Sequence, residues 1–192
     1  MSMQITDMRS SETSIEGLLI FTLKQVSDER GTVREFFRAS AHAGALGGEL
    51  PEGGWRQVNV TESGYGAIRG LHGEATTKLV GCVSGAAFGA YLDARPGSAS
   101  FGKLVTVDLS PGTQVLVPAG VCNGFQSVSP EGSQYLYCFT EEWRPGMPGS
   151  AYSPLDEGLG LDWPIPVDAG NPAQISAKDA AAPKFSEQIV SG

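Results

Sequence analysis

The chain has 192 residues, a length that usually forms one domain with a sizeable core, and its formal net charge is −8. This acidic balance argues against a large nucleic-acid or anionic-membrane surface, because such partners attract basic proteins, but it allows a small phosphorylated ligand held by a few local cations. The three cysteines have no metal-binding spacing, and we find no signal-peptide pattern and no apolar run of membrane-spanning length. We therefore expect a cytoplasmic protein without disulfides.

The composition favours strands and turns over long helices. The chain contains 26 glycines, 12 prolines and 41% hydrophobic residues. We expect an all-β fold of the sandwich or barrel type, in a single domain over residues 1–192. Within that domain we assign residues 1–16 to an N-terminal arm, residues 17–165 to the β body and residues 166–192 to a C-terminal helical segment.

The first quarter of the chain predicts an arm, two extended segments and a connection. Residues 1–16 are polar without a sustained period, which is typical of a loose arm. Extended segments at residues 17–23 and 32–38 flank turn-forming residues, and a connection with room for a short helix follows at 39–54. In the second segment Glu35 shares a face with Val33 and Phe37, so it is either solvent-facing or a buried ligand.

Two later segments carry polar residues in positions that suggest a site. A strand at residues 55–60 places Gln57 and Asn59 on one face, where amides serve either turn chemistry or the polarity of a pocket. Residues 66–80 bring Arg69, His72 and Lys78 into one apolar segment, and strict alternation there would place Arg69 and His72 on opposite faces. His72 is then either a core histidine satisfied by a backbone partner or a site residue.

From Lys78 onward turn signals recur about every 8 to 12 residues, as in antiparallel sandwiches and barrels. The expected strands cover residues 79–83, 86–93, 103–109, 114–117, 124–128 and 133–139. Residues 176–182 predict a short helix capped by Ser176, in a C-terminal segment that packs across the barrel.

The chemistry that the residues support is proton transfer. No glycine-rich nucleotide loop is present, and the two histidines form no His-x-His pair, so we predict no metal. A histidine can remove a proton from carbon next to a carbonyl when a cation stabilises the enolate oxygen, and Lys78 is a candidate for that cation. Such a base usually needs a carboxylate that fixes its tautomer, which the residues alone do not identify.

Eight motifs, in order and spacing, resemble the dTDP-4-dehydrorhamnose 3,5-epimerase family over roughly residues 17–185. They are DERGTVREF at 28–36, QVN at 57–59, IRGLH at 68–72, KLV at 78–80, DARPGSASFG at 93–102, VPAG at 117–120, NGF at 123–125 and LDWP at 161–164. The resemblance implies a cupin jelly roll, a homodimer that exchanges N-terminal strands, and action on a dTDP-4-keto-6-deoxyhexose without metal or other cofactor.

The resemblance also implies roles for individual residues. His72 matches the base that removes the proton at C3 or C5, Asp179 matches its carboxylate partner, and Lys78 matches the residue that faces the C4 oxygen. The residues expected to bind substrate are Arg69 and Gln57 on the diphosphate side, Asn59 beside Gln57, Arg30, Glu35 and Phe36 near the nucleotide from this chain or a partner subunit, and Asn123, Trp143 and Glu141.

Two positions depart from the family pattern. Trp143 stands where the resemblance implies the tyrosine that reprotonates carbon on the opposite face, and Asn123 stands in place of a second imidazole. An indole N–H does not act as a general acid near neutral pH, although it can donate a hydrogen bond or stack on a sugar. If residues 133–143 stay extended, Glu141 lies about 7 Å from Trp143 and Tyr137 about 20 Å. We then expect Glu141 or an ordered water to replace the acid.

Three functions follow from these observations. The first is an epimerase that acts at C3, at C5 or at both carbons of a dTDP-4-keto-6-deoxyhexose in deoxysugar biosynthesis. The second, motivated by Trp143 and Asn123, is an enzyme of the same fold recruited to a cyclisation or isomerisation in secondary metabolism. The third is a binding protein without catalytic activity.

Overall fold

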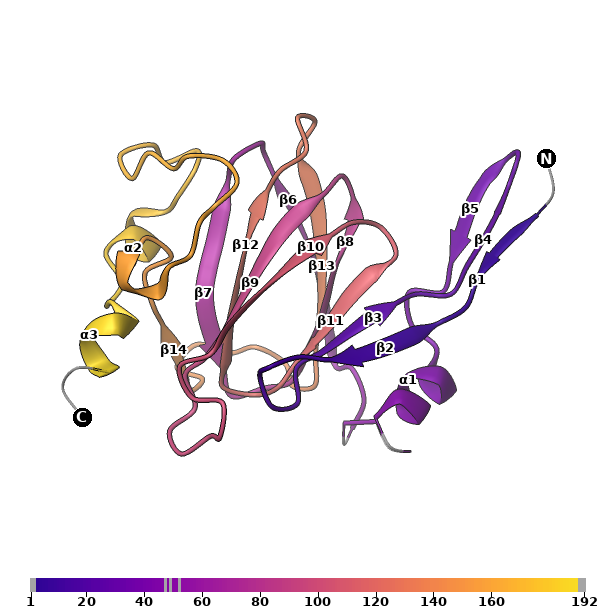
Figure 1. Cartoon of the computed structure of the whole chain (residues 1–192), viewed down its shortest axis with the longest axis horizontal. Coiled ribbons are helices and arrows are strands. Elements are labelled where there is room, and N and C mark those ends of the chain that lie inside the picture. Colours follow the sequence, from indigo (N-terminus) through magenta and orange to yellow (C-terminus); the bar gives the residue numbers. More distant parts are fainter. Residues whose placement is uncertain (1–2, 47, 49, 52, 190–192) are drawn as a thin grey trace.

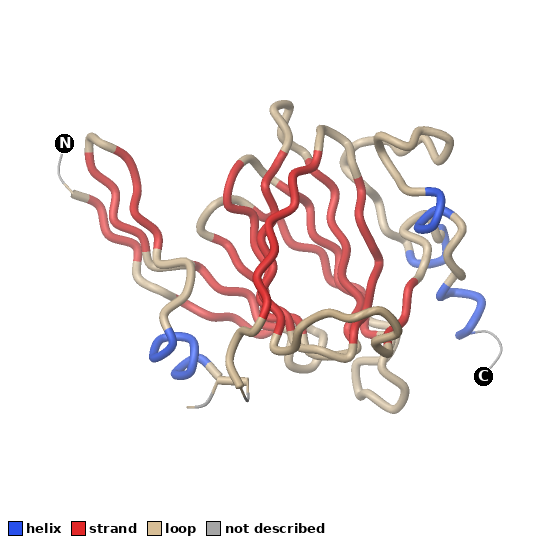
Figure 2. Tube along the Cα trace, turned by 180° about the vertical axis from the view of Figure 1, so that it is seen from behind, coloured by secondary structure: helices blue, strands red, loops and turns tan. Residues whose placement is uncertain are grey.

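Two antiparallel β-sheets packed face to face form the body of the protein, and a third, smaller sheet projects from it (Figure 1). The computed structural model describes residues 3–46, 48, 50–51 and 53–189. The small sheet and the C-terminal helices lie at opposite ends of the molecule, as Figure 2 also shows from behind. The predicted all-β fold is confirmed.

The first sheet of the body has five strands, in the spatial order β10-β9-β12-β7-β14. In chain order their bounds are β7 Ile68–Glu74, β9 Ala87–Asp93, β10 Leu104–Leu109, β12 Val121–Ser127 and β14 Gly149–Ala151. The second sheet has six strands, in the order β2-β3-β11-β8-β13-β6. Their bounds are β2 Arg9–Glu12, β3 Leu19–Thr22, β6 Gln57–Ser63, β8 Lys78–Ser84, β11 Thr113–Val117 and β13 Ser133–Phe139.

The main core lies between these two sheets. Val80 and Tyr135 enter it from the six-stranded sheet, and Tyr91 and Phe125 enter it from the five-stranded sheet. Each of these side chains is at most 4% exposed, and burial of a large apolar side chain contributes about 1.5–3 kcal/mol. These side chains therefore join the inner faces of the two sheets.

The small sheet is an arm made of β1 (Gln4–Thr6), β4 (Gln25–Asp28) and β5 (Gly31–Arg34), and α1 (Ala39–Ala45) follows it in the chain. The first part of the chain differs from the sequence-based expectation in two respects. The described part of the expected loose arm forms strands, because β1 pairs with β4 and β2 pairs with β3. The segment expected at residues 32–38 leaves the strand after Arg34, and Glu35 forms an ion pair with Arg38.

The C-terminal segment covers the outer face of the five-stranded sheet (Figure 1). It contains a 3₁₀ turn η1 (Glu157–Leu159), α2 (Ala177–Ala180) and α3 (Phe185–Ile189). Phe185 is fully buried in a cluster with Leu71 of β7 and Tyr152. The predicted cap is present, since Ser176 Oγ accepts a hydrogen bond from the Asp179 backbone N–H at 3.0 Å. None of the described helices is long and apolar enough to cross a membrane.

Candidate active site

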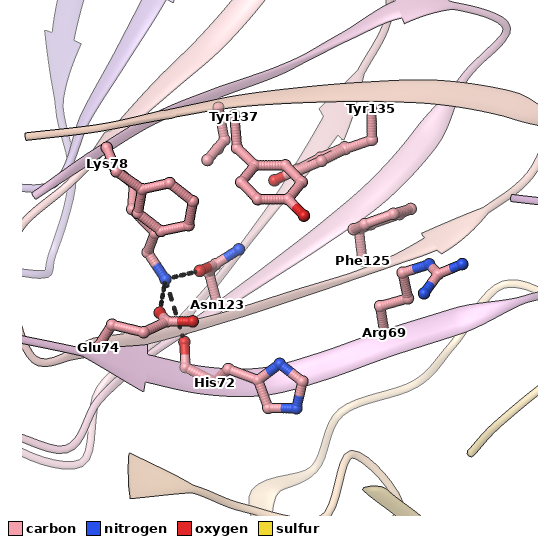
Figure 3. A pocket seen from close by; sticks show the side chains of 10 residues that line it. Arg69, His72, Glu74, Lys78, Asn123, Phe125, Tyr135 and Tyr137 are labelled. Carbon is pink, nitrogen blue, oxygen red and sulfur yellow. Dashed lines mark hydrogen bonds and ion pairs between the residues drawn. The ribbon is translucent and has the colours of Figure 1, made fainter. Parts of the chain in front are cut away.

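A cavity of about 110 Å³ opens between the two sheets of the body (Figure 3). Its lining residues come from β7, β8, β12 and β13. They are Arg69, His72, Glu74, Lys78, Val80, Asn123, Phe125, Tyr135, Tyr137 and Phe139. Four of the predicted site residues therefore line one cavity, namely Arg69, His72, Lys78 and Asn123. A fifth, Asp179, does not line it but contacts His72.

An irregularity in β7 brings Arg69 and His72 to the same side of the sheet. His72 pairs with Asn123 and Arg69 pairs with Phe125, so three steps along β7 match two steps along β12, which is the pattern of a β-bulge. Both side chains line the cavity, and the expected placement on opposite faces is wrong. Gly70 makes this possible, because its φ is +117° and a Cβ there would lie 2.5 Å from the Gly124 Cα.

His72 is held by a carboxylate from the C-terminal segment. Its Nε2 lies 2.8 Å from Asp179 Oδ1, and the Asp179 side chain is only 9% exposed. Burial alone would raise the pKa of Asp179, but hydrogen bonds from His72, from Ser176 and from the Gly70 backbone lower it below its usual value. The ionised carboxylate thus fixes the orientation of the imidazole.

Lys78 is almost fully buried, and its ammonium has three acceptors around it. Nζ donates to the His72 carbonyl oxygen at 3.2 Å, to Asn123 Oδ1 and to Glu74 Oε2 (Figure 3). Burial lowers the pKa of Lys78, and the charge of Glu74 opposes that shift. His72, Glu74, Lys78 and Asn123 together are called the charged side of the cavity below.

Sequence reasoning did not include Glu74 among the site residues. It stands two residues after His72 and four residues before Lys78, across a short turn between β7 and β8. A buried lysine requires a counter-ion, so a carboxylate near the same turn was the signal that could have identified it.

The aromatic side of the cavity is formed by three residues of β13, namely Tyr135, Tyr137 and Phe139. The sequence analysis did not predict that these three residues line one site. Their spacing of two residues along a strand places them on one face and was the available signal. Tyr135 stacks on Phe125 with ring centroids 4.0 Å apart. The Tyr137 hydroxyl accepts a hydrogen bond from Thr61 Oγ1 at 3.3 Å.

Gln57, Asn59 and Trp143 adjoin one another, but none of them lines the cavity. Gln57 donates to Asn59 Oδ1 at 3.2 Å, and the Trp143 backbone N–H donates to Gln57 Oε1 at 2.7 Å. The predicted alternation along β6 is confirmed, because Gln57 and Asn59 are half-buried whereas Val58 and Val60 are exposed. Trp143 is 54% exposed.

Glu141 is exposed and does not line the cavity. The expectation that residues 133–143 stay extended is wrong, because β13 ends at Phe139. The strand alternation that placed Glu141 beside Trp143 therefore does not apply. Tyr137, which this reasoning ranked below Glu141, is the residue that reaches the cavity.

Arg30, Glu35 and Phe36 lie outside the cavity of their own chain. Arg30 occupies the turn between β4 and β5 at the end of the arm and pairs with Asp28 (Figure 1). Phe36 packs against a separate apolar cluster that includes Phe21 and Leu79. A role for these three residues in this cavity would require a second copy of the chain.

Cysteine and carboxylate side chains form no metal-binding group within the described part of the chain. No cluster of three His, Cys, Asp or Glu side chains there could hold an ion. Cys82, Cys122 and Cys138 are free thiols, and burial raises the pKa of Cys122 and Cys138 to about 11. These thiols remain protonated near neutral pH.

Comparison with known proteins agrees with this geometry. The family model described as dTDP-4-dehydrorhamnose 3,5-epimerase matches residues 12–187. The enzyme of that name from Salmonella typhimurium is 34% identical over 185 residues, which cover 93% of this chain and 96% of the relative.

Two crystal structures share the fold. The dTDP-6-deoxy-D-glucose-3,5-epimerase from Legionella pneumophila, solved with dTDP-4-keto-L-rhamnose, has a TM-score of 0.81 at 33% identity and 93% coverage of both chains. A 4-keto-6-deoxy sugar epimerase from the novobiocin biosynthetic gene cluster of Streptomyces spheroides has a TM-score of 0.85 at 28% identity, covering 98% of this chain and 93% of that one. The prediction made from the eight motifs is confirmed: the chain belongs to the dTDP-4-dehydrorhamnose 3,5-epimerase family, a family of isomerases.

Proposed function

We propose that the protein epimerises C3, C5 or both carbons of a dTDP-4-keto-6-deoxyhexose in deoxysugar biosynthesis. The observation that carries the proposal is that His72, held by Asp179 at 2.8 Å, lines the same cavity as the buried Lys78. The names of the relatives, and the dTDP-4-keto-L-rhamnose bound to the Legionella pneumophila enzyme, support this substrate class.

His72 acts as the base. Because its Nε2 faces the ionised Asp179, the proton of the neutral imidazole resides on Nε2 and leaves Nδ1 free to accept a proton from carbon. Removal of that proton moves negative charge onto the C4 ketone oxygen. Asp179 stabilises the imidazolium that forms.

Lys78 and Asn123 stabilise the enolate oxygen. The three acceptors of Nζ hold the ammonium in place before substrate arrives, and a substrate oxyanion replaces one of them. Because Asn123 Oδ1 accepts from Lys78, its amide nitrogen points away from the ammonium, as Figure 3 shows, and has hydrogens to donate. Arg69, whose guanidinium is anchored by Ser63 Oγ at 3.1 Å, is the cation of the cavity for the diphosphate.

The protein acts as a homodimer in which the arm of one chain reaches its partner. The arm extends away from the body (Figure 1, Figure 2), and its Ile5 and Val33 are 57% and 73% exposed, which a second copy would cover. In this arrangement Arg30 binds the nucleotide in the partner's cavity. Light scattering is expected to give twice the chain mass, and Arg30→Ala to weaken dTDP binding without changing that mass.

The three free thiols favour a reducing compartment, so we place the activity in the cytoplasm.

The test of the proposed function is incubation with dTDP-4-keto-6-deoxyglucose in D₂O, followed by ¹H NMR. The expected result is replacement of the C3 or C5 hydrogen by deuterium together with an inverted product. Absence of exchange at both carbons would exclude the epimerase. In parallel, dTDP at millimolar concentration is expected to raise the melting temperature, since a ligand that binds only the folded state stabilises it. No stabilisation would favour a different substrate class.

A further inference from the structure

Asn123 lies in the middle of a row of three residues that crosses the five-stranded sheet. It pairs with His72 of β7 on one side and with Tyr91 of β9 on the other. Residues that stand directly opposite one another on neighbouring strands point to the same face of a sheet. The row therefore begins at the base in the cavity and ends at a phenol in the main core, where Tyr91 is 0% exposed.

A second phenol reaches the same part of the core from the six-stranded sheet. The ring of Tyr135 is held by stacking on Phe125 at 4.0 Å, and its hydroxyl interacts with the Tyr91 hydroxyl. Gly89 leaves room for the Tyr91 oxygen, because a Cβ on Gly89 would lie 2.9 Å from it. Two phenol oxygens therefore meet inside the core beside Asn123.

These two hydroxyls are expensive in free energy at their positions. Tyr91 and Tyr135 are 0% and 1% exposed, and neither oxygen makes a hydrogen bond of normal geometry within the described part of the chain. A buried hydroxyl without a full hydrogen bond costs about 1–3 kcal/mol, and phenylalanine would fill the same space without that cost. Packing alone therefore does not account for the two oxygens.

The polar neighbours of the two oxygens form a chain that leads to Lys78. Burial raises the pKa of both phenols, so both keep their hydrogens near neutral pH. Against that shift, the Asn123 side chain lowers the pKa of Tyr135 and the Tyr135 hydroxyl lowers that of Tyr91, as hydrogen-bond donors do. Lys78 Nζ in turn donates to Asn123 Oδ1. The direction of donation is therefore from the ammonium through the amide and the first phenol to the second.

Both ends of the Asn123 amide consequently have a neighbour. Oδ1 accepts from Lys78, and the amide nitrogen, which points away from the ammonium in Figure 3, interacts with Tyr135. An amide nitrogen carries two hydrogens, so one remains for a ligand in the cavity. The Tyr135 oxygen itself is enclosed by the core, so its effect on the reaction must pass through Asn123.

We propose that Tyr135, supported by Tyr91, is a positioning residue that holds the Asn123 amide, and through it the Lys78 ammonium, in the orientation that receives the C4 enolate oxygen. This role rests on the proposed epimerase function and assigns a task to two core residues that the proton-transfer pair does not use. Neither phenol gains or loses a proton during turnover. Because donors oriented in advance stabilise charge as it develops, the effect falls on kcat and not on KM.

The experiment is a double-mutant cycle of Tyr135→Phe and Asn123→Ala, with kcat and KM measured on dTDP-4-keto-6-deoxyglucose. We expect Tyr135→Phe to lower kcat about tenfold at unchanged KM, the size of one well-placed hydrogen bond. In the Asn123→Ala background the same change is expected to alter kcat by less than about twofold, because the residue through which Tyr135 acts is already gone. Tyr152→Phe removes a hydroxyl from another buried tyrosine, outside the cavity, and should keep the wild-type kcat as the matched control.

Tyr91→Phe carries the test if Tyr135→Phe does not fold, and it is expected to lower kcat about threefold when Asn123 is present and not when it is absent. The melting temperature should not fall in either variant, since neither hydroxyl has a full hydrogen bond to lose. Equal losses of kcat in both backgrounds, an unchanged kcat, or a raised KM at unchanged kcat would overturn the positioning role and leave the proposed function standing. A wild type without turnover would overturn both.

Discussion

The two sides of the cavity differ in how their polar atoms are held. On the charged side, His72 is fixed by Asp179, and Lys78 is fixed by Glu74, Asn123 and a backbone carbonyl. On the aromatic side, the Thr61 contact is the hydrogen bond that the described structure gives to Tyr137. The charged side is therefore organised before substrate binds, and the aromatic side supplies shape and, at Tyr137, a weakly held hydroxyl.

This difference indicates how the reaction is divided. Proton abstraction creates charge, and a preorganised set of charged groups stabilises it without reorganisation at the moment of reaction. Proton delivery neutralises charge and needs correct placement more than a strong field. Variants of the charged side should consequently affect both exchange and inversion, in proportion to how directly each residue meets the reacting atoms.

The largest effect is expected for His72→Asn, which keeps an amide donor toward Asp179 but removes the base. Exchange and inversion are both expected to fall by about 10⁴-fold, the upper range for a general base. Steady-state turnover and deuterium exchange measure the two losses. Residual exchange within tenfold of wild type would show that another group takes the proton.

The next effect is expected for Asp179→Asn, because the imidazole loses the charge that sets its tautomer. We expect turnover to fall by about 10³-fold, as for a carboxylate that orients a catalytic histidine. Loss of the charge-assisted hydrogen bond should also lower the free energy of unfolding by about 1–3 kcal/mol. Turnover and denaturant unfolding are measured on the same preparation.

The stability difference between wild type and Asp179→Asn depends on pH in a defined direction. The folded-state pKa of Asp179 is lowered below the ordinary value of about 3.9. Its contribution is complete above that ordinary value and is lost as the pH falls through the lower, folded-state pKa. The two unfolding free energies should stay apart above about pH 5 and converge below about pH 4. A constant difference down to pH 2 would contradict the assigned ion pair.

A smaller effect is expected for Lys78→Met, which keeps the length of the side chain without its charge. Loss of one charged donor to the enolate oxygen should lower turnover by about 10²-fold. Lys103→Met makes the same change at an exposed position and should leave turnover unchanged. Equal effects of the two variants would contradict a local role for the ammonium.

The smallest effect is expected for Gln57→Ala. Gln57 lies outside the cavity and holds the Trp143 backbone at 2.7 Å, so its loss should loosen the segment that follows β13. We expect KM to rise about threefold with little change in kcat. The free energy of binding lost in this way is smaller than the net contribution of one typical hydrogen bond. A large fall in kcat would place Gln57 closer to the chemistry than its position indicates.

The same comparison explains what could be predicted from the sequence. His72 and Lys78 were accessible because few residue types can take a proton or stabilise an enolate. The carboxylate partner of His72 was not accessible in this way, and Asp179 was identified through the family resemblance. The alternation of Tyr135, Tyr137 and Phe139 was present in the sequence, but alternation does not reveal which face meets the base.

Two features could not be predicted, for physical reasons. The bulge that brings Arg69 beside His72 depends on the close approach of Gly70 to Gly124, which are far apart in the chain. The end of β13 at Phe139 removed the basis for choosing Glu141, since strand alternation holds only while the strand lasts.

The division of labour between the two sides is the central claim, and one measurement tests it most directly. Wild type, His72→Asn and Tyr137→Phe are incubated with dTDP-4-keto-6-deoxyglucose in D₂O, and exchange and inversion are followed separately by ¹H NMR. The account predicts that His72→Asn loses both events and that Tyr137→Phe loses inversion alone. Loss of both events to the same extent in both variants, or inversion by Tyr137→Phe at the wild-type rate, would contradict it.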